Sequence, residues 1–203
     1  SWHLHKEGKS FIVIDEERKN TASRVAAGII NPVTGRRYSI TWMVEDLFPF
    51  AQQVYGEVET YLGTNLFYHK SVIDFFPTPQ MRNTFVERLA ENDTYLHSYP
   101  DQNRFNQYFN YDFGCGEIRP AYMADVNTLL LQWQKELKKT GRLKEEKFIA
   151  EELVLNNDGV TYQNITAEKI VFCDGTSSTQ NKWFELLPFS PNKGEALIVE
   201  CEE

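Results

Sequence analysis

The residues best suited to holding a small anionic ligand lie near the start of the chain. An apolar run over residues 11–14 ends at Asp15, and the small-residue sequence Ser23-Arg-Val-Ala-Ala-Gly28 follows. A carboxylate at the end of a strand can accept hydrogen bonds from both hydroxyls of a ribose. Small residues let backbone N–H groups approach an anion or a flat ring. The pattern predicts a nucleotide site; the alternatives are a charged strand end and a tight loop in which Ser23 caps a helix.

The other chemically reactive residues are too scattered to predict a metal site or a nucleophile. His3 and His5 are two positions apart, so a helix points them in different directions. No P-loop, HExxH or nucleophile elbow is present, and no catalytic residue is predicted. Arg36-Arg37 could meet a substrate carboxylate, but a surface turn is the preferred interpretation. The chain has three widely spaced cysteines, which indicate buried free thiols in a reducing compartment: Cys115, Cys173 and Cys201.

Hydrophobic periodicity and punctuating residues predict the elements that position these groups. Helices are expected at 1–8, at 42–62 with a break or kink near Phe48 caused by Pro49, from Thr78-Pro79 to Glu91, and from Asp125 to Gly141. Strands are expected at 10–14, 66–76, 147–155, 160–162, 169–173 and 194–200, with a hairpin turn at 156–159. Residues 92–122 are expected to be irregular.

Composition limits the partners of the chain. Its 203 residues have a net charge of -8, which disfavours nucleic acid and anionic membranes. No apolar run approaches the ~20 residues that span a bilayer, and no signal peptide is visible. We therefore expect a cytoplasmic protein without a membrane span. Aromatic residues, at 14%, cluster between Tyr38 and Tyr122, where core packing is a better interpretation than a pocket.

Residues 11–32 resemble the second strand and following loop of FAD-dependent amine oxidoreductases of the D-amino-acid oxidase and glycine oxidase family. In that family an acid ends the strand and holds the adenosine ribose, and a Ser-rich, Ala-Gly loop contacts the pyrophosphate and flavin. The resemblance assigns the ribose to Asp15, with Glu16 as the fallback. It assigns the cofactor loop to Ser23, Arg24, Ala27 and Gly28, with Asn31-Pro32 just beyond it.

Later segments resemble the return part of the same family. Leu129 to Gly141 and Ala167 to Ser178 match a helix and a strand that ends beside the cofactor at Gly175. The hairpin strand around Phe148 and Ile149 corresponds to a segment that contacts adenine. Residues 188–199 resemble the strand that re-enters the substrate domain.

The resemblance implies an α/β fold, a partial FAD-binding Rossmann-like layer with an inserted α+β substrate domain. Its parts are the FAD-binding residues 1–45, the insertion 46–124, the FAD-binding return segment 125–180 and a final strand in 181–203. No G-x-G-x-x-G occurs, although that loop normally receives the pyrophosphate. We therefore expect an internal fragment of a longer enzyme, in which FAD binds the parent protein and not this chain.

The implied activity is oxidation of a small-molecule amine or amino acid by hydride transfer to FAD in the parent protein, with this fragment inactive. One alternative is a non-catalytic α/β binding or interaction module. Another is an NAD-linked dehydrogenase, which would share the acid-tipped strand but not the Ala22–Gly28 loop. The substrate, the electron acceptor and the oligomeric state are not predicted.

Overall fold

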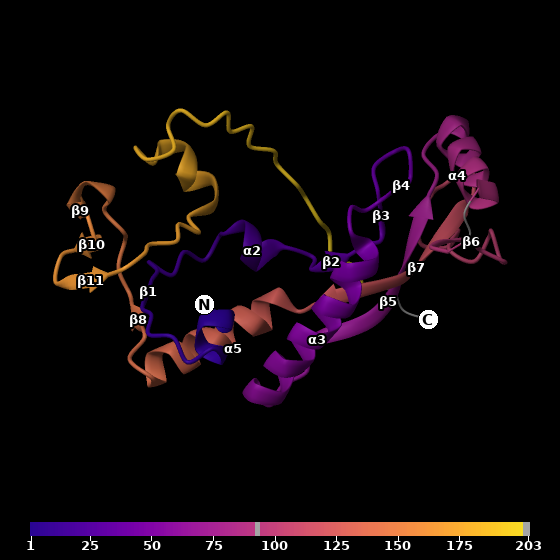
Figure 1. Ribbon diagram of the computed structural model, residues 1–203. Helices are drawn as coiled ribbons and strands as arrows, with labels where there is room; N and C mark the ends of the chain where they lie inside the picture. Colours follow the sequence, from indigo (N-terminus) through magenta and orange to yellow (C-terminus); the bar gives the residue numbers. More distant parts are fainter. Residues whose placement is uncertain (92–93, 201–203) are drawn as a thin grey trace. The chain divides into compact units, whose positions relative to one another are not determined.

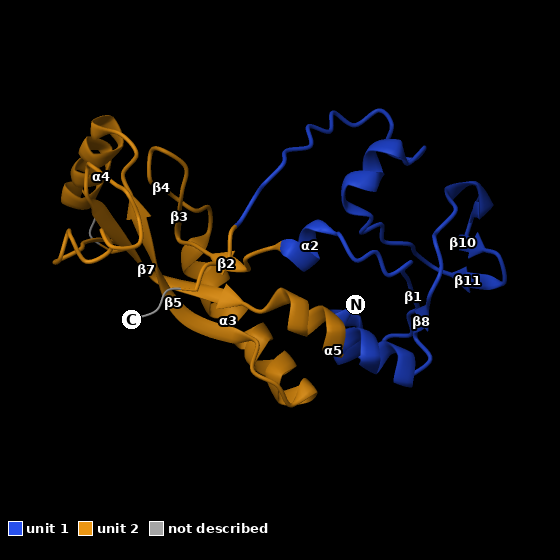
Figure 2. Ribbon diagram, turned by 180° about the vertical axis from the view of Figure 1, so that it is seen from behind, with its two compact units in different colours: residues 1–25, 133–196 blue, residues 26–132, 197–203 orange. Residues whose placement is uncertain are grey.

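The computed structural model describes residues 1–91 and 94–200, which form two compact units. Figure 2 colours them separately. The first unit comprises residues 1–25 and 133–196, and the second comprises the described residues of 26–132 and 197–200. No helix in the described residues is both long and apolar enough to cross a membrane.

The second unit is built on an antiparallel sheet centred on β7 (Cys115–Ala124) (Figure 1). One edge of β7 pairs with β5 (Phe67–Phe75), and the other pairs with both β6 (Leu96–Ser98) and β2 (Ile29–Ile30). Pro120 lies between the stretches of β7 that pair with β6 and with β2. Its missing N–H therefore removes no bond to either strand, which explains a proline in a central strand.

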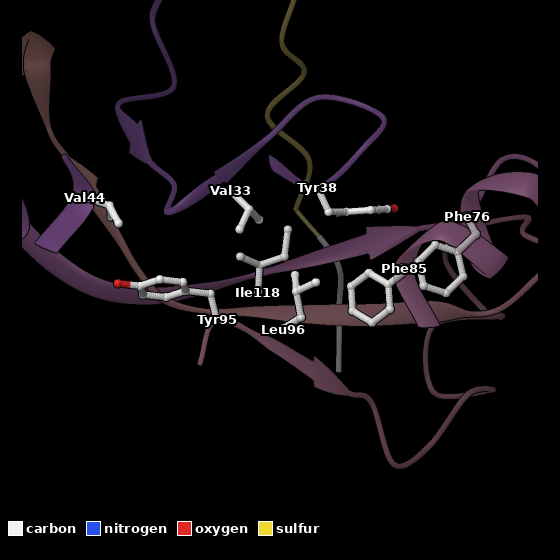
Figure 3. Packing of buried hydrophobic residues seen from close by; sticks show 8 residues of the cluster. All are labelled: Val33, Tyr38, Val44, Phe76, Phe85, Tyr95, Leu96 and Ile118. Carbon is white, nitrogen blue, oxygen red and sulfur yellow. The ribbon is translucent and has the colours of Figure 1, made fainter. Parts of the chain in front are cut away.

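One face of this sheet is covered by two helices and a hairpin. These are α3 (Val44–Leu62), α4 (Pro79–Glu91) and the pair β3 (Val33–Thr34) and β4 (Ser39–Ile40). Their apolar side chains meet those of the sheet in one buried cluster, shown in Figure 3: Val33, Tyr38, Val44, Phe76, Phe85, Tyr95, Leu96 and Ile118. The aromatic-rich segment thus supplies core packing, as the sequence predicted.

The first unit begins with α1 (Trp2–Lys6) and contains a short parallel pair of strands, β1 (Val13–Ile14) and β8 (Leu143–Lys144). A four-residue helix, α2 (Ala22–Val25), follows β1. An antiparallel sheet of β9 (Leu153–Asn156), β10 (Gly159–Tyr162) and β11 (Ile165–Ala167) comes later, between the 3-10 turns η1 (Ala150–Glu152) and η2 (Gly175–Gln180).

The last helix, α5 (Val126–Lys139), and two other predicted features are confirmed. The Thr128 N–H donates to the Asp125 carboxylate at 2.9 Å, the bond expected of an N-cap, and Gly141 ends the segment with φ +66°. The Met81 N–H donates to the Thr78 hydroxyl at 3.3 Å at the start of α4. A two-residue turn joins β9 to β10 where the hairpin was expected.

Several sequence predictions are wrong, in whole or in part. The irregular segment 92–122 contains β6 and most of β7. Residues 169–173 and 194–200 form no strand, and residues 147–152 are a loop and a 3-10 turn. The helix α3 continues through Pro49 without the expected break, and a kink near Phe48 stays a prediction. The first error reflects long-range pairing. Among the residues that the structure describes, no strand pairs with 169–173 or 194–200.

The cysteines match the sequence prediction only in part. Cys115 is a buried free thiol, as expected, whereas Cys173 is free but exposed. Cys201 lies outside the described residues.

Candidate cofactor site

The candidate site begins at the carboxyl ends of the parallel strands β1 and β8. Asp15 directly follows β1, and its N–H donates to the Lys144 carbonyl at 3.1 Å. The segment that leads to Ile149 directly follows β8. Carboxyl ends of neighbouring parallel strands form the ligand-binding edge of open α/β sheets. Two of the sequence-predicted residues, Asp15 and Ile149, therefore lie on segments that leave the same edge.

The Asp15 side chain is exposed, and one of its two carboxylate oxygens accepts a hydrogen bond. Its Oδ1 accepts the Glu17 N–H at 2.7 Å, closing a short turn in which Glu17 has φ +56°. Within residues 1–91 and 94–200, no group donates to Asp15 Oδ2. A carboxylate with one fixed and one free oxygen can accept a hydrogen bond from a ligand hydroxyl.

Glu16, the fallback acid, is held by another charge. Its Oε1 lies 2.5 Å from Arg18 Nε, and Arg18 also donates to the Ser177 hydroxyl at 3.3 Å. This second bond ties the segment after β1 to η2, whose first residue is Gly175. The structure therefore brings the segment of Glu16 close to the segment of Gly175. Glu16 is paired with a cation, whereas Asp15 has one oxygen available to a ligand.

Asp174, just before Gly175, faces its own 3-10 turn. Its carboxylate accepts hydrogen bonds from the Ser178 hydroxyl and from Asn181 Nδ2. Burial acts to raise its pKa, but these bonds favour the ionised form more and leave the pKa lowered. Its charge is thus satisfied within η2.

The small-residue loop divides between the two units. Ser23 and Arg24 lie in α2. At the start of this helix, the Arg24 N–H donates to the Thr21 carbonyl at 3.0 Å and to the Thr21 hydroxyl at 3.4 Å. Thr21, and not Ser23, therefore caps this helix. Ala27 and Gly28 belong to the second unit.

Gly28 has a clear structural role in the second unit. Its φ is +69°, and a Cβ at this position would lie 1.9 Å from the Ala124 carbonyl oxygen. The Ala124 N–H donates to the Gly28 carbonyl at 2.9 Å, just before β2 pairs with β7. Only glycine fits such a close backbone approach.

Ile149 lies beside an aromatic cluster of the first unit. Phe148 stacks on Tyr162 with ring centroids 4.7 Å apart and meets Phe172 edge-on. The Ile149 N–H donates to the Tyr162 hydroxyl at 3.2 Å, and its side chain is 41% exposed. Phe148 is thus engaged in packing, while Ile149 offers an open apolar surface.

Sequence analysis missed a cluster of charged and polar side chains around Glu17, two residues past Asp15. Lys138 Nζ lies 2.9 Å from Glu17 and 2.6 Å from Glu145, and Gln134 also donates to Glu17. The bond from Lys138 lowers the pKa of Glu17, and the bond that Lys138 donates to Glu145 is the main cause of the raised pKa of Lys138. These residues are far apart in the chain, so no local pattern indicates their contact.

The remaining candidates give no second site. Arg36 and Arg37 form the turn between β3 and β4, where the Arg37 carbonyl accepts a bond from Arg88 at 3.3 Å. This agrees with a surface turn. No group of His, Cys, Asp or Glu side chains in the described part of the chain could hold a metal ion.

Comparison with known proteins shows a shared fold. No family model matches the chain. Iminodiacetate oxidase from Chelativorans sp. BNC1 matches with a TM-score of 0.55 at 14% identity, over 78% of this chain and 46% of that protein. L-Amino acid deaminase from Proteus vulgaris matches with a TM-score of 0.52 at 12% identity, over 78% of this chain and 39% of that protein. The chain is thus a mixed α/β fold that resembles part of each and spans less than half of their length.

Proposed function

We propose that this chain is part of a cytoplasmic FAD-dependent oxidoreductase that oxidises an amine or amino acid. The observation that carries the proposal is Asp15, with one carboxylate oxygen without a partner in the described residues, at the carboxyl end of the parallel pair β1–β8. The fold shared with an iminodiacetate oxidase and an L-amino acid deaminase supports the substrate class. Because the chain spans less than half of either, we propose the activity for a longer protein.

The residues of the first unit fit the adenosine end of FAD. Asp15 would accept hydrogen bonds from the ribose, and the exposed Ile149 would pack against adenine. Arg24 and the backbone of Ser23 and Gly175 would face the phosphates, where a guanidinium suits an anion. Ala27 and Gly28 stay in the proposal on the family resemblance alone.

The flavin, when bound, would accept a hydride from the substrate carbon next to nitrogen. The part of this chain is to bind and orient the cofactor. We propose 1–45 and 125–180 as cofactor-binding parts, 46–124 as the substrate part and 181–203 as the return to it. We also propose that the 203 residues alone hold no FAD, because the proposed pyrophosphate loop is not among them.

The first test is the visible spectrum of the protein made from the complete gene, before and after addition of FAD. We expect a flavin spectrum. A protein that stays colourless with FAD but binds NAD would favour an NAD-linked dehydrogenase. One that binds neither would favour a non-catalytic module, and ordered FAD in crystals of the 203-residue chain would contradict the fragment proposal.

The site is tested by Asp15→Ala in the same protein. A charged hydrogen bond contributes ~1.5–3 kcal/mol, so we expect FAD affinity to fall about 10-fold to 100-fold. Glu16→Ala is the matched control, because that carboxylate already pairs with Arg18, and its affinity should stay near wild type. Fluorescence titration of apo-protein with FAD measures both, and equal affinities for Asp15→Ala and wild type would remove Asp15 from the site.

A further inference from the structure

Lys138, near the end of α5, joins the segments that follow both parallel strands. Its ammonium lies 2.9 Å from Glu17, two residues past Asp15, and 2.6 Å from Glu145, the first residue after β8. One cation thus links two carboxylates on the two segments that leave the candidate ligand-binding edge. Gln134, one turn earlier on α5, also donates to Glu17.

The Glu17 backbone holds the Asp15 side chain. The Glu17 N–H donates to Asp15 Oδ1 at 2.7 Å, and Glu17 itself has a left-handed backbone conformation, with φ +56°. Residues other than glycine adopt that conformation at a cost, so it persists where other contacts fix it. The side-chain bonds from Lys138 and Gln134 are such contacts.

We propose that Lys138 and Glu17 are positioning residues for FAD, because they fix the orientation of the Asp15 carboxylate. Lys138 and Gln134 hold the Glu17 side chain, and Glu17, fixed in this position, presents its N–H to Asp15 Oδ1. Oδ2 is then left in a fixed place for a ribose hydroxyl. This inference rests on the proposed function and adds that three residues, not one acid, form the ribose site.

The test uses the protein from the complete gene and titration of its apo-form with FAD. Exposed ion pairs contribute ~0.2–1 kcal/mol, so Lys138→Met and Glu17→Gln should each weaken FAD binding by about 1.4-fold to fivefold. Lys139→Met is the control: this neighbouring lysine pairs with Glu136 at 3.5 Å and does not contact Glu17. Lys138→Arg keeps the charge and should retain most of the affinity.

A double-mutant cycle separates positioning from general destabilisation. If Lys138 acts through Asp15, then Lys138→Met should have no further effect on FAD affinity when Asp15 is already alanine. Amide hydrogen exchange at Glu17, measured without FAD, should be faster in Lys138→Met than in Lys139→Met. An equal loss of affinity in both backgrounds, or unchanged exchange at Glu17, would overturn the inference.

The failure of the inference can be told from that of the proposed function. If Asp15→Ala weakens FAD binding but Lys138→Met and Glu17→Gln do not, the inference is overturned and the proposed site stands. If Asp15→Ala leaves FAD affinity unchanged, the ribose role of Asp15 fails, and the positioning role fails with it. If both variants weaken binding and the cycle is non-additive, both proposals are supported.

Discussion

Two buried tyrosines of the second unit donate their hydroxyls to carboxylates. Tyr38 donates to Asp74 at 2.5 Å, and Tyr95 donates to Glu45. Burial, followed by the hydrogen bond to each carboxylate, raises the pKa of both phenols, that of Tyr95 to about 12. Each phenol therefore stays neutral and satisfies a charge at the margin of the apolar cluster.

Replacement of Tyr95 by Phe should change the alkaline limit of stability. A folded-state pKa raised from 10.0 to about 12 means that the stabilisation is complete below pH 10 and is lost as the pH rises toward 12. The free energy of unfolding, measured with urea between pH 9 and about 12, should therefore fall less steeply with pH in Tyr95→Phe than in wild type. At neutral pH this variant should lose about 1 kcal/mol with the hydrogen bond.

Tyr68→Phe is the matched control, because Tyr68 is exposed and, within the described residues, its hydroxyl bonds only to the Asn65 carbonyl, at 3.3 Å. It should keep the wild-type dependence on pH. If the free energy of unfolding falls equally steeply with pH in wild type, Tyr95→Phe and Tyr68→Phe, the Tyr95–Glu45 bond has no part in alkaline unfolding.

At the scale of elements, Gly28 sets how closely the entry to β2 can approach the end of β7. Gly28→Ala should destabilise the protein by more than about 2 kcal/mol, because the new Cβ would meet the Ala124 carbonyl and φ is +69°. Gly56→Ala is the contrasting variant. Gly56 lies within α3, and a Cβ added there would meet open space, so alanine should stabilise by about 0.5–1 kcal/mol.

Denaturant unfolding of both variants, followed by circular dichroism, measures these changes. An alanine tolerated at residue 28 would mean that the β2 entry can move away from β7 at little cost. If Gly28→Ala in the protein from the complete gene then lost FAD binding, the loss would indicate a contact of residue 28 with the cofactor and not a change in the fold.

The elements predicted correctly are those whose signals are local. The caps at Thr78 and Asp125 and the turn between β9 and β10 involve residues within three positions of one another. The strand β7 was missed because Pro120 and the charged residues around it disfavour a central strand. Only the positions of β6 and β2 along its edge, set by the tertiary fold, make that proline acceptable.

The candidate site was predictable to the same extent. The acid at the end of β1 follows from an apolar run and its last residue. The contact of Lys138 with Glu17 joins the end of α5 to the segment after β1, far away in the chain, and no sequence periodicity indicates it. The strands expected at 169–173 and 194–200 show the opposite failure: apolar residues such as Val171, 77% exposed, do not make a strand without a partner.

For the molecule as a whole, large apolar side chains remain exposed in both units. In the second unit, Trp42 is 78% exposed, and Phe50 is 54% exposed at an apolar pocket of about 280 Å³ beside the start of α3. In the first unit, Leu186 is 93% exposed. Soluble proteins seldom expose contiguous apolar surface without a use for it. If the chain is part of a longer protein, as proposed, these side chains should be less exposed in that protein.

The pocket at the start of α3 should make the isolated 203-residue chain bind a hydrophobic dye such as ANS. Phe50→Ser should reduce the dye fluorescence, because it removes an exposed aromatic ring from the pocket wall. Leu155→Ser is the control, since Leu155 is 53% exposed on β9 and lies outside the pocket. An equal reduction in both variants would mean that the dye detects exposed side chains in general. A reduction confined to Phe50→Ser would locate the dye at the pocket. Weaker dye binding by the protein from the complete gene would then indicate that other residues of that protein cover the pocket.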